Sequence, residues 1–535
     1  MKPTKSLLIS FAGYPYTPSS LMPDNGLANL AGSLIREGHK TQILDYGTID
    51  TVRRLRLPVN YRESAQYPPE KIRQMNRTIE ASQREKTMQI VQEIVEYAKK
   101  EQVDFVGLKL WNGDGFTGSL MIAEELKKNI PRIYVFAGGP HVDWFRELIF
   151  RRTQYIDALV YEEGEETIVQ LAEFVQGSKR LEEIPNLIFR NADRFMRTPS
   201  RRIKDLNSLA SPCYDEDIYP AMRGNEKIKI FVIDESRGCN NICNFCIQPI
   251  KSGYLREKDP QKVVDEMEAI IKKHGIGAFK YAGSNTSTNL AEAIAHEIIR
   301  RKLKVMYTSF ARISEAGQQD FELLRRAGCY ALFYGVESGN QEILNKAINK
   351  RVTLSQIEHV VKETKKAGIK VVASIIVPSP FETEQTKKQT LEFLVKIDPD
   401  SVPVCPPGLV PGSIWTKHPD RFGFELESDF NFVMMCYKLK LNYPLIFWDL
   451  LPYKLDGKRS DEIFRESFEC AQALEKRGFT TQIADDILLM AYYAEMSPRD
   501  FRDQNRELFL KGDYGTLEEI VKKINENIQK VQNNP

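Results

Sequence analysis

The strongest constraint on the fold is an alternation of short apolar runs with amphipathic segments, which continues through most of the 535 residues. Residues 6–11 (SLLISF) form the first run, residues 23–37 follow with apolar side chains at helical spacing, and residues 41–44 form the next run. This alternation predicts parallel strands joined by crossover helices. We therefore expect an α/β chain that begins with a doubly wound sheet, whose ligands bind at the carboxyl ends of the strands.

The pattern divides the chain into three predicted parts, 1–200, 201–415 and 416–535. The second part contains six strand–helix units, too few for an eightfold barrel, and predicts an open, partial (β/α)6 barrel. The third part is mostly helical in pattern and ends in an amphipathic segment at 516–532. It also contains an aromatic run from Phe432 to Trp448, which we expect to be the core of a helical domain rather than a substrate pocket.

The composition argues against two classes of protein. Lys and Arg number 75 and Asp and Glu number 73, so the net charge of +2 does not fit a nucleic-acid scaffold, whose affinity comes from clustered positive charge. No apolar run reaches the roughly 18 residues that a spanning helix needs, and the start of the chain resembles a strand more than a signal peptide. We expect a cytoplasmic protein with no membrane span and no nucleic-acid partner.

Three of the eight cysteines lie within eight residues, at Cys239, Cys243 and Cys246. In a reducing cytoplasm, the spacing C-x3-C-x2-C points to metal or redox chemistry rather than to disulfides. Three thiolates on one loop can hold three irons of a cubane cluster and leave the fourth iron open. A zinc knuckle is the alternative, but zinc prefers four ligands in two pairs, and no second Cys/His pair lies nearby. Of the other cysteines, we expect Cys329 and Cys405 to be buried, inert thiols.

The same spacing, with Phe245 just before the last cysteine, resembles the radical S-adenosylmethionine (radical SAM) superfamily. The resemblance implies a [4Fe–4S] cluster whose open iron binds the amino and carboxylate groups of SAM, which is then cleaved to a 5′-deoxyadenosyl radical. It also implies that Phe245 packs near the adenine. The other implied SAM contacts lie at later strand ends: Ser284, Asn285, Arg312, Glu337, Ser338 and Val377. The chain lacks the glutamate that members often carry after two glycines at the second strand end.

A doubly wound domain before a radical SAM core resembles the cobalamin-binding subfamily, and this similarity extends over about 400 residues. It implies an α/β protein with a Rossmann-like cobalamin-binding domain, a partial radical SAM barrel and a helical C-terminal domain. The four glycine-containing strand ends of the first domain are expected at 12–24, 111–119, 138–143 and 161–166. The implied cobalamin contacts are Trp111, Asn112, Gly113, Gly138, Gly139, His141, Glu163, Gly164 and Glu165.

The cobalamin motif D-x-H-x-x-G, whose histidine coordinates cobalt, is absent from the chain. We therefore expect His141 to support or cap the site rather than to bind cobalt. No G-x-G-x-x-G follows the first strand, which disfavours a dinucleotide. An empty domain is the remaining alternative.

The resemblance implies a cobalamin-dependent radical SAM enzyme that methylates an unactivated carbon. A rearrangement, cyclisation or oxidation with the same cofactors is one alternative, and a cobalamin- or redox-sensing binding protein is another. The expected substrate is a small molecule, a lipid or a peptide, and the expected electron donor is of the flavodoxin or ferredoxin type. No catalytic residue is assigned from the sequence.

Overall fold

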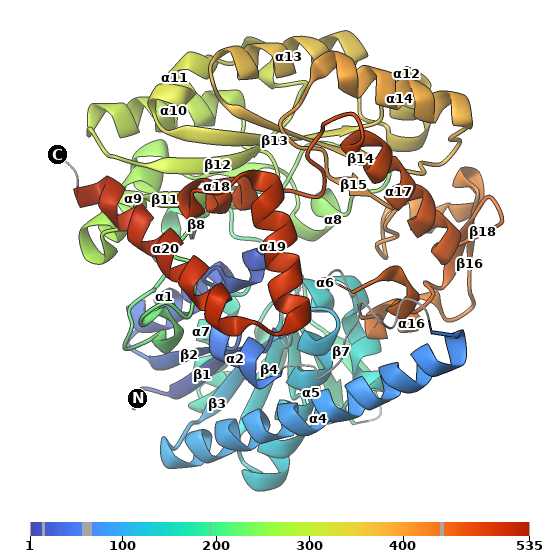
Figure 1. Cartoon of the computed structure of the whole chain (residues 1–535). Coiled ribbons are helices and arrows are strands. Elements are labelled where there is room, and N and C mark those ends of the chain that lie inside the picture. The colour runs from blue at the N-terminus through green and yellow to red at the C-terminus, as the bar shows by residue number, and fades with distance from the viewer. Residues whose placement is uncertain (1, 13–16, 56–66, 193, 439–442, 534–535) are drawn as a thin grey trace.

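The computed structural model describes residues 2–12, 17–55, 67–192, 194–438 and 443–533. It contains two large, mostly parallel sheets with helices packed on their faces, as the α/β alternation predicts. In Figure 1 the blue-to-cyan N-terminal sheet lies below the green-to-orange barrel sheet, and the red C-terminal helices lie beside the boundary between them.

The N-terminal sheet has seven strands in the order β2-β1-β3-β4-β5-β6-β7. The first five are parallel and form a doubly wound core, which confirms the predicted Rossmann-like fold. Two antiparallel strands extend it at one edge, and the sequence pattern did not predict them. The strands are β1 (Lys5–Ser10), β2 (Lys40–Asp45), β3 (Phe105–Lys109), β4 (Tyr134–Gly138), β5 (Ala158–Val160), β6 (Leu187–Asn191) and β7 (Arg194–Arg197).

The helices of this part begin at polar or glycine caps, except α4, which follows Pro68. The Asp24 carboxylate accepts a hydrogen bond from the Leu27 amide and starts the first helix, because it satisfies a donor that has no partner within the helix. The segment expected at 12–24 is described only in part, since residues 13–16 lie outside the described ranges. The helices are α1 (Asn25–Arg36), α2 (Ile49–Arg54), α4 (Pro69–Lys100), α5 (Asp114–Asn129), α6 (Pro140–Phe145) and α7 (Glu165–Val175).

The second sheet has six strands, all parallel, in the order β15-β14-β13-β12-β11-β8, which confirms the predicted partial barrel. Its strands are β8 (Phe231–Ile233), β11 (Ala278–Tyr281), β12 (Met306–Ala311), β13 (Cys329–Glu337), β14 (Lys370–Ile376) and β15 (Val404–Cys405). Its outer helices are α9 (Pro260–His274), α10 (Thr288–Arg300), α11 (Phe321–Arg326), α13 (Leu354–Lys366) and α14 (Glu384–Ile397). The boundaries at 200 and 415 stay predictions.

A buried polar network joins the two sheets. Lys227, which precedes β8, lies with its Nζ 2.5 Å from Asp45 Oδ2 at the end of β2, and both side chains are almost fully buried. The Tyr219 hydroxyl donates to the same carboxylate and accepts a hydrogen bond from the Asp24 amide at 2.7 Å. A buried ion pair tolerates little movement, because separating its charges leaves them unpaired in a medium of low dielectric. The network therefore holds the segment that leads into β8 against the carboxyl edge of the N-terminal sheet.

The C-terminal part covers the open edge of the barrel. The Val402 amide donates to the Thr480 carbonyl at 2.9 Å, and the Ser401 hydroxyl donates to the Ile483 carbonyl at 2.7 Å. This part is mostly helical as predicted, and it adds a small antiparallel sheet of β16 (Phe424–Leu426), β17 (Tyr453–Leu455) and β18 (Lys458–Arg459). Its helices are α16 (Phe430–Cys436), α17 (Ser460–Glu475), α18 (Asp485–Ala494), α19 (Pro498–Lys511) and α20 (Tyr514–Asn533).

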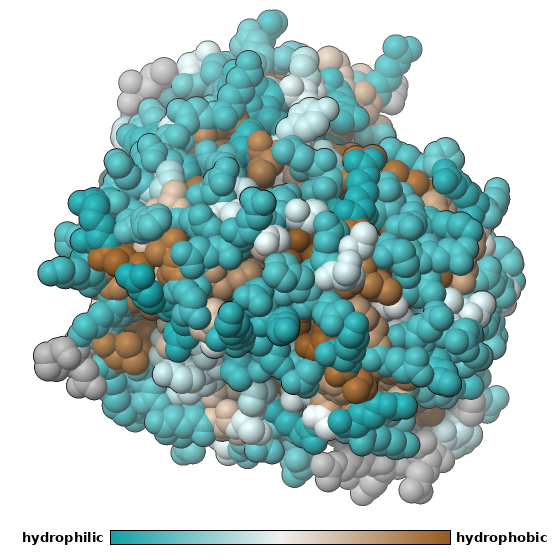
Figure 2. Space-filling view, turned by 90° about the horizontal axis from the view of Figure 1, so that it is seen from above, coloured by the Kyte–Doolittle hydropathy of each residue, from teal (hydrophilic) through white to brown (hydrophobic). Residues whose placement is uncertain are grey.

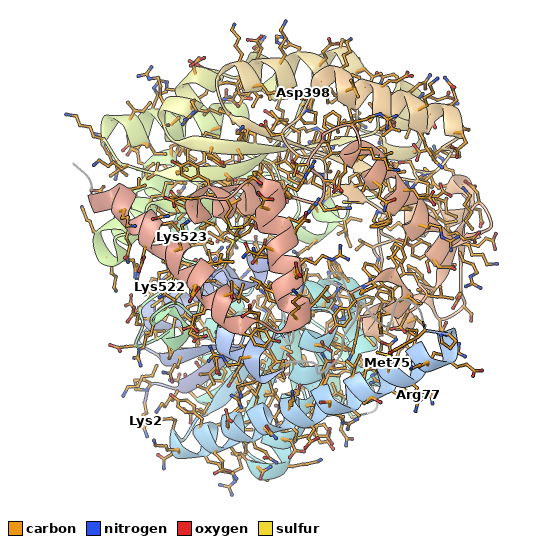
Figure 3. All side chains as sticks on the ribbon, in the orientation of Figure 1. Lys2, Met75, Arg77, Asp398, Lys522 and Lys523 are labelled. Atoms are coloured by element: carbon orange, nitrogen blue, oxygen red, sulfur yellow. The ribbon has the colours of Figure 1, made fainter. Side chains whose placement is uncertain are left out.

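The last helix is amphipathic, as the sequence predicts for 516–532. Its buried side includes Leu517 and Ile524, while Lys522 and Lys523 are exposed on its outer side (Figure 3). The aromatic run behaves largely as core: Phe447 is fully buried and Tyr437 nearly so, although residues 439–442 lie outside the described ranges.

The surface seen from above is mainly hydrophilic, with scattered apolar patches (Figure 2). Within the part of the chain that the structure describes, no helix combines the length and the apolar character that crossing a bilayer requires.

Candidate functional site

The three clustered cysteines lie just beyond the carboxyl end of β8, between β9 (Ser236–Arg237) and α8 (Gln248–Ser252). All three are free thiols, and each sulfur has a nitrogen donor close by. Asn241 Nδ2 lies 3.6 Å from Cys239 Sγ, Arg312 Nη1 lies 3.6 Å from Cys243 Sγ, and the Gln248 amide lies 3.4 Å from Cys246 Sγ. Such donors stabilise the thiolate form of a cysteine. They also tune the reduction potential of a cluster that the thiolates hold.

The backbone of this loop requires glycine at one position. Gly238 has a φ of +90°, and a Cβ built there would lie 2.2 Å from the Tyr254 carbonyl oxygen. The next amide, that of Cys239, donates to the Gly253 carbonyl at 3.0 Å. The first cysteine is therefore held against the hairpin of β9 and β10 (Arg256–Glu257), and no larger residue fits between Arg237 and Cys239.

The chemistry of this loop fits a bound iron–sulfur cluster better than it fits three free thiols. Burial, reinforced by the neighbouring thiols Cys243 and Cys239, raises the pKa of Cys246 to about 11. A bound metal removes that penalty, because it takes the thiol in its deprotonated form. Three cysteines on one loop, with a donor at each sulfur, match a cluster held at three corners. Among the described residues, no three His, Cys, Asp or Glu side chains gather around a single metal ion position.

Several predicted SAM contacts meet at the mouth of the barrel. Arg312, at the end of β12, reaches Cys243 with one nitrogen and donates to the Lys350 carbonyl with another. Lys350 Nζ in turn lies 2.7 Å from Glu337 Oε1 at the end of β13. Arg312 and Glu337 are both buried, so this chain connects two predicted positions to the cysteine loop.

The second strand end is organised by a residue that the sequence did not single out. The Glu235 carboxylate accepts hydrogen bonds from the Gly283 amide at 3.1 Å and from the Thr286 hydroxyl at 2.7 Å. Ser284, between them, is exposed, whereas Asn285 is buried and bonds to Glu315 at 2.8 Å. The position that lacks the usual glutamate is thus held by a glutamate that lies just after β8. Burial raises the pKa of Glu235.

The other predicted SAM contacts do not all lie near the cysteine loop. Phe245 is half-buried, and its ring centroid lies 5.8 Å from that of Trp415. The Ser338 hydroxyl faces Thr390 on α14, and Val377 is buried with its carbonyl bonded to Ser467. The structure does not bring these last two side chains to the cysteine loop.

The inner face of the barrel is partly accessible. The strand register places Lys280, Phe310, Phe333 and Cys405 on one face of the sheet. Lys280 on this face lies 3.4 Å from Asp485 of α18, which packs inside the barrel, whereas the opposite face carries Tyr334, which bonds to the outer helix α13. Phe310 and Phe333 are half-buried and pack edge to face at 4.8 Å.

The expectation of a buried, inert thiol holds for Cys329, which is fully buried at the start of β13. Cys405 is accessible to solvent, although burial raises the pKa of its thiol to about 11 and so disfavours the reactive thiolate. Cys405 is the last residue of a two-residue edge strand, and its side chain points to the open inner face.

A cavity of about 360 Å³ lies between the carboxyl edge of the N-terminal sheet and the barrel. Five of the predicted cobalamin positions line it: Gly138, Gly139, Glu163, Gly164 and Glu165. Gly139 has a φ of +100°, a conformation that side-chain-bearing residues rarely adopt, so its backbone forms the wall directly. Backbone walls and apolar side chains such as Leu27, Leu30 and Ile168 offer contacts to part of a large cofactor such as a corrinoid.

The other four cobalamin predictions do not line this cavity. Trp111 is 43% exposed and packs on Trp144 at 5.5 Å, beside Asn112 and Gly113. His141 is buried between Phe116 and Phe145, with both ring centroids at 4.7 Å. Its Nε2 lies 2.8 Å from the Met435 carbonyl, so the imidazole ties α6 to α16. Burial lowers the pKa of His141 to about 4 and keeps it neutral.

The cavity wall also contains charged residues that sequence reasoning missed. Lys109 Nζ lies 2.6 Å from Asp24 Oδ2, and Asp143 is a buried carboxyl whose pKa burial raises to about 6. Asp234 and Arg237 come from the barrel domain. Arg237 had a sequence signal, because it lies two residues before Cys239.

Two known protein families match this chain, one in the barrel and one in the N-terminal part. Residues 235–394 match the radical SAM superfamily, and residues 75–172 match the B12 binding domain. The first match contains all three cysteines, and the second contains the glycine-rich strand ends of the cavity.

Individual relatives agree with this pair of domains. The chain is 28% identical over 318 residues to an uncharacterized methyltransferase of Pyrococcus horikoshii. This match covers 58% of this chain and 67% of the relative. It is 28% identical over 303 residues to an anaerobic magnesium-protoporphyrin IX monomethyl ester cyclase of Cereibacter sphaeroides, covering 53% of this chain and 48% of the relative. The chain thus spans about half the length of that cyclase.

The whole fold resembles a solved structure. The radical SAM methyltransferase TsrM of Kitasatospora setae, solved with cobalamin and a [4Fe–4S] cluster bound, superposes with a TM-score of 0.65 at 16% identity, covering 96% of this chain and 100% of that one. At this identity the likeness concerns the fold alone.

The fold and the two domain matches define the class: the chain is a radical SAM protein with a B12-binding domain. It therefore belongs with the cobalamin-dependent radical SAM enzymes. The first domain implies a [4Fe–4S] cluster and SAM as cofactors, and the second implies cobalamin.

Proposed function

We propose that this enzyme transfers a methyl group from SAM to an unactivated carbon of its substrate. The observation that carries the proposal is the shared wall between the two sites: Arg237, two residues before Cys239, lines the cavity of the B12-binding domain. An unactivated carbon is not a nucleophile, so direct transfer from SAM is blocked and two cofactors must act close together. The similarity to a methyltransferase over 318 residues supports this choice.

The chain's own residues have separate tasks in this proposal. Cys239, Cys243 and Cys246 would hold the cluster, and Arg312 and Glu337 would orient SAM at the barrel mouth. When bound, the cluster and SAM supply the 5′-deoxyadenosyl radical, and cobalamin carries the methyl group. The protein has to position the substrate between them and keep water and other quenchers out.

The accessible inner face supplies the place for the substrate. Phe310 and Phe333 offer apolar contacts, and Lys280 offers a polar one. We propose a small molecule, a lipid or a peptide as substrate and a flavodoxin- or ferredoxin-type protein as electron donor. A cluster with an open iron needs a reducing compartment, so we place the enzyme in the cytoplasm.

The similarity to a cyclase over 303 residues favours a second candidate, a cyclisation without methyl transfer. Anaerobic turnover with methyl-labelled SAM separates the two. Label in the product supports methyl transfer, whereas 5′-deoxyadenosine with unlabelled product supports cyclisation. Failure to cleave SAM at all would favour a sensing protein over either enzyme.

A further inference from the structure

We propose that Arg237 is a positioning residue that couples cobalamin binding to the cluster loop, so that each cofactor strengthens the binding of the other. This inference rests on the proposed function, because it needs both cofactors. It concerns the chain's own residues: a buried ion network that belongs at once to the wall of the cavity and to the base of the cysteine loop.

The first half of the network joins Arg237 to the N-terminal domain. Arg237 Nη2 lies 2.5 Å from Glu165 Oε1 and 3.3 Å from Asp234 Oδ2. Glu165 is the first residue of α7, where the helix dipole favours a carboxylate. All three residues line the cavity, so a ligand that fills the cavity contacts the network itself.

The second half comes from the partner strand of the same hairpin. Arg256 pairs with Arg237 in the β9–β10 register, and its guanidinium makes two hydrogen bonds to Glu163, at 2.8 and 2.9 Å. Glu163 lies two residues before Glu165 on the same glycine-containing loop. Each strand of the hairpin therefore contributes one arginine to one loop of the B12-binding domain. A two-pronged guanidinium–carboxylate contact fixes orientation as well as distance.

Because these charged side chains are buried, their contacts are strong enough to couple the cavity to the cysteine loop. The side chains of Arg237 and Arg256 are each 15% exposed, Glu163 is 10% exposed and Glu165 is 9% exposed. Salt screens such charges only weakly. A guanidinium keeps its charge at any working pH, so Arg237 can pair with Glu165 and Asp234 under all conditions of the test.

The link to the cluster is short. Only Gly238 separates Arg237 from Cys239, and its neighbours on both sides are tied to the hairpin. A cluster orders this loop by holding its three cysteines, and a corrinoid orders it by packing against Glu163, Glu165 and Arg237. Whichever binds first removes part of the ordering cost for the second, so the coupling is positive and must be reciprocal.

The test compares cobalamin affinity in two states of the full-length protein, with the cluster reconstituted and with the iron removed by a chelator. Hydroxocobalamin is titrated into each state, and the ratio of the two Kd values measures the coupling. For the wild type we expect binding to be at least about fivefold tighter with the cluster present, the lower end of ordinary coupling between sites. For Glu165→Gln we expect the ratio to fall close to one.

The matched control is Glu166→Gln on the next residue. Glu166 is 47% exposed, pairs with Arg201 on the surface and does not line the cavity. This variant should keep the wild-type ratio. A purely structural role of Glu165 would weaken both Kd values equally and leave the ratio unchanged, so the ratio separates positioning from folding.

Two further measurements keep the proposal testable if Glu165→Gln fails to fold. Arg237→Lys keeps the charge but loses the planar guanidinium that contacts both Glu165 and Asp234, and it should give an intermediate ratio. In the wild type, added hydroxocobalamin should slow iron loss to a chelator. The proposal is overturned if the wild-type ratio is one, if cobalamin does not slow iron loss, or if folded Glu165→Gln keeps the wild-type ratio. Methyl transfer without coupling would overturn this inference alone, and coupling without methyl transfer would overturn only the proposed reaction.

Discussion

Arg312 Nη1 lies 3.6 Å from Cys243 Sγ, and the same guanidinium is held in place by Ser314 and by the Lys350 carbonyl. A fixed positive charge next to one cysteine of a [4Fe–4S] cluster stabilises the reduced form, which carries one more electron. The side chain that the resemblance assigned to SAM binding thus also acts on the cluster ligand.

Replacing Arg312 by Gln should therefore lower the reduction potential of the cluster. We expect a shift of the order of a tenfold change in the redox equilibrium, about 59 mV for one electron. An anaerobic redox titration followed by electron paramagnetic resonance measures it. Arg326→Gln, an exposed position on α11, is the control and should not shift the potential. A raised or unchanged potential in Arg312→Gln would contradict the assignment.

Replacing Cys239, Cys243 and Cys246 by Ala should abolish iron binding and SAM cleavage together. The three thiols are the protein's ligands on this loop, and without them no thiolate there can hold a cluster. Iron analysis and the visible spectrum after anaerobic reconstitution provide the readout. The control is Cys213→Ala, an isolated cysteine between β7 and β8, which should retain both iron binding and SAM cleavage. A triple variant that keeps the iron absorption would show that the cluster lies elsewhere.

His141→Asn should leave the cobalt environment unchanged. The imidazole packs between two phenylalanines and bonds to the Met435 carbonyl, so its loss should cost about 1–3 kcal/mol of stability through an unpaired acceptor. The electron paramagnetic resonance spectrum of bound cob(II)alamin should show no nitrogen splitting that depends on this residue. If nitrogen splitting is present in the wild type and disappears in the variant, His141 is a cobalt ligand.

Asp143 should make stability fall as pH rises through the acid range. Burial raises its pKa from 3.8 to about 6, so the folded state holds the proton more tightly than the unfolded chain. The stabilisation is fully present below pH 3.8 and is lost as pH rises through about 6; the difference corresponds to at most about 3 kcal/mol.

Asp143→Asn should therefore raise the Tm at pH 7 relative to the wild type, and the gain should shrink at pH 5. Asparagine can still accept the hydrogen bond that the Glu162 amide donates at 2.6 Å. Thermal unfolding at the two pH values measures the difference. An equal gain at both pH values would show that ionisation of Asp143 is not the cause.

The sequence was informative wherever neighbours in the chain are also neighbours in space. The loop from Arg237 to Cys246 and the alternation of strands with helices both follow from local patterns. The ion pairs that shape the cavity do not. Arg256 and Glu163 are 93 residues apart, and nothing near either one predicts the other.

The direction in which a side chain points was the second property that the sequence did not predict. His141 follows the glycines of a strand end, as a ligand-binding residue would, but the short helix α6 turns it toward α16. Ser338 and Val377 follow strand ends too, yet the Ser338 hydroxyl faces Thr390 on α14 and the Val377 side chain is buried. A position at the carboxyl edge of a sheet predicts proximity to the ligand, whereas the face that a side chain presents depends on helices far along the chain.

The most direct test of the account is an iron and cobalt count on protein reconstituted anaerobically with iron, sulfide and hydroxocobalamin and then freed of unbound cofactor. We predict about four irons and about one cobalt per chain, with the visible spectrum of an iron–sulfur cluster. Iron without cobalt, or zinc in place of iron, would contradict it.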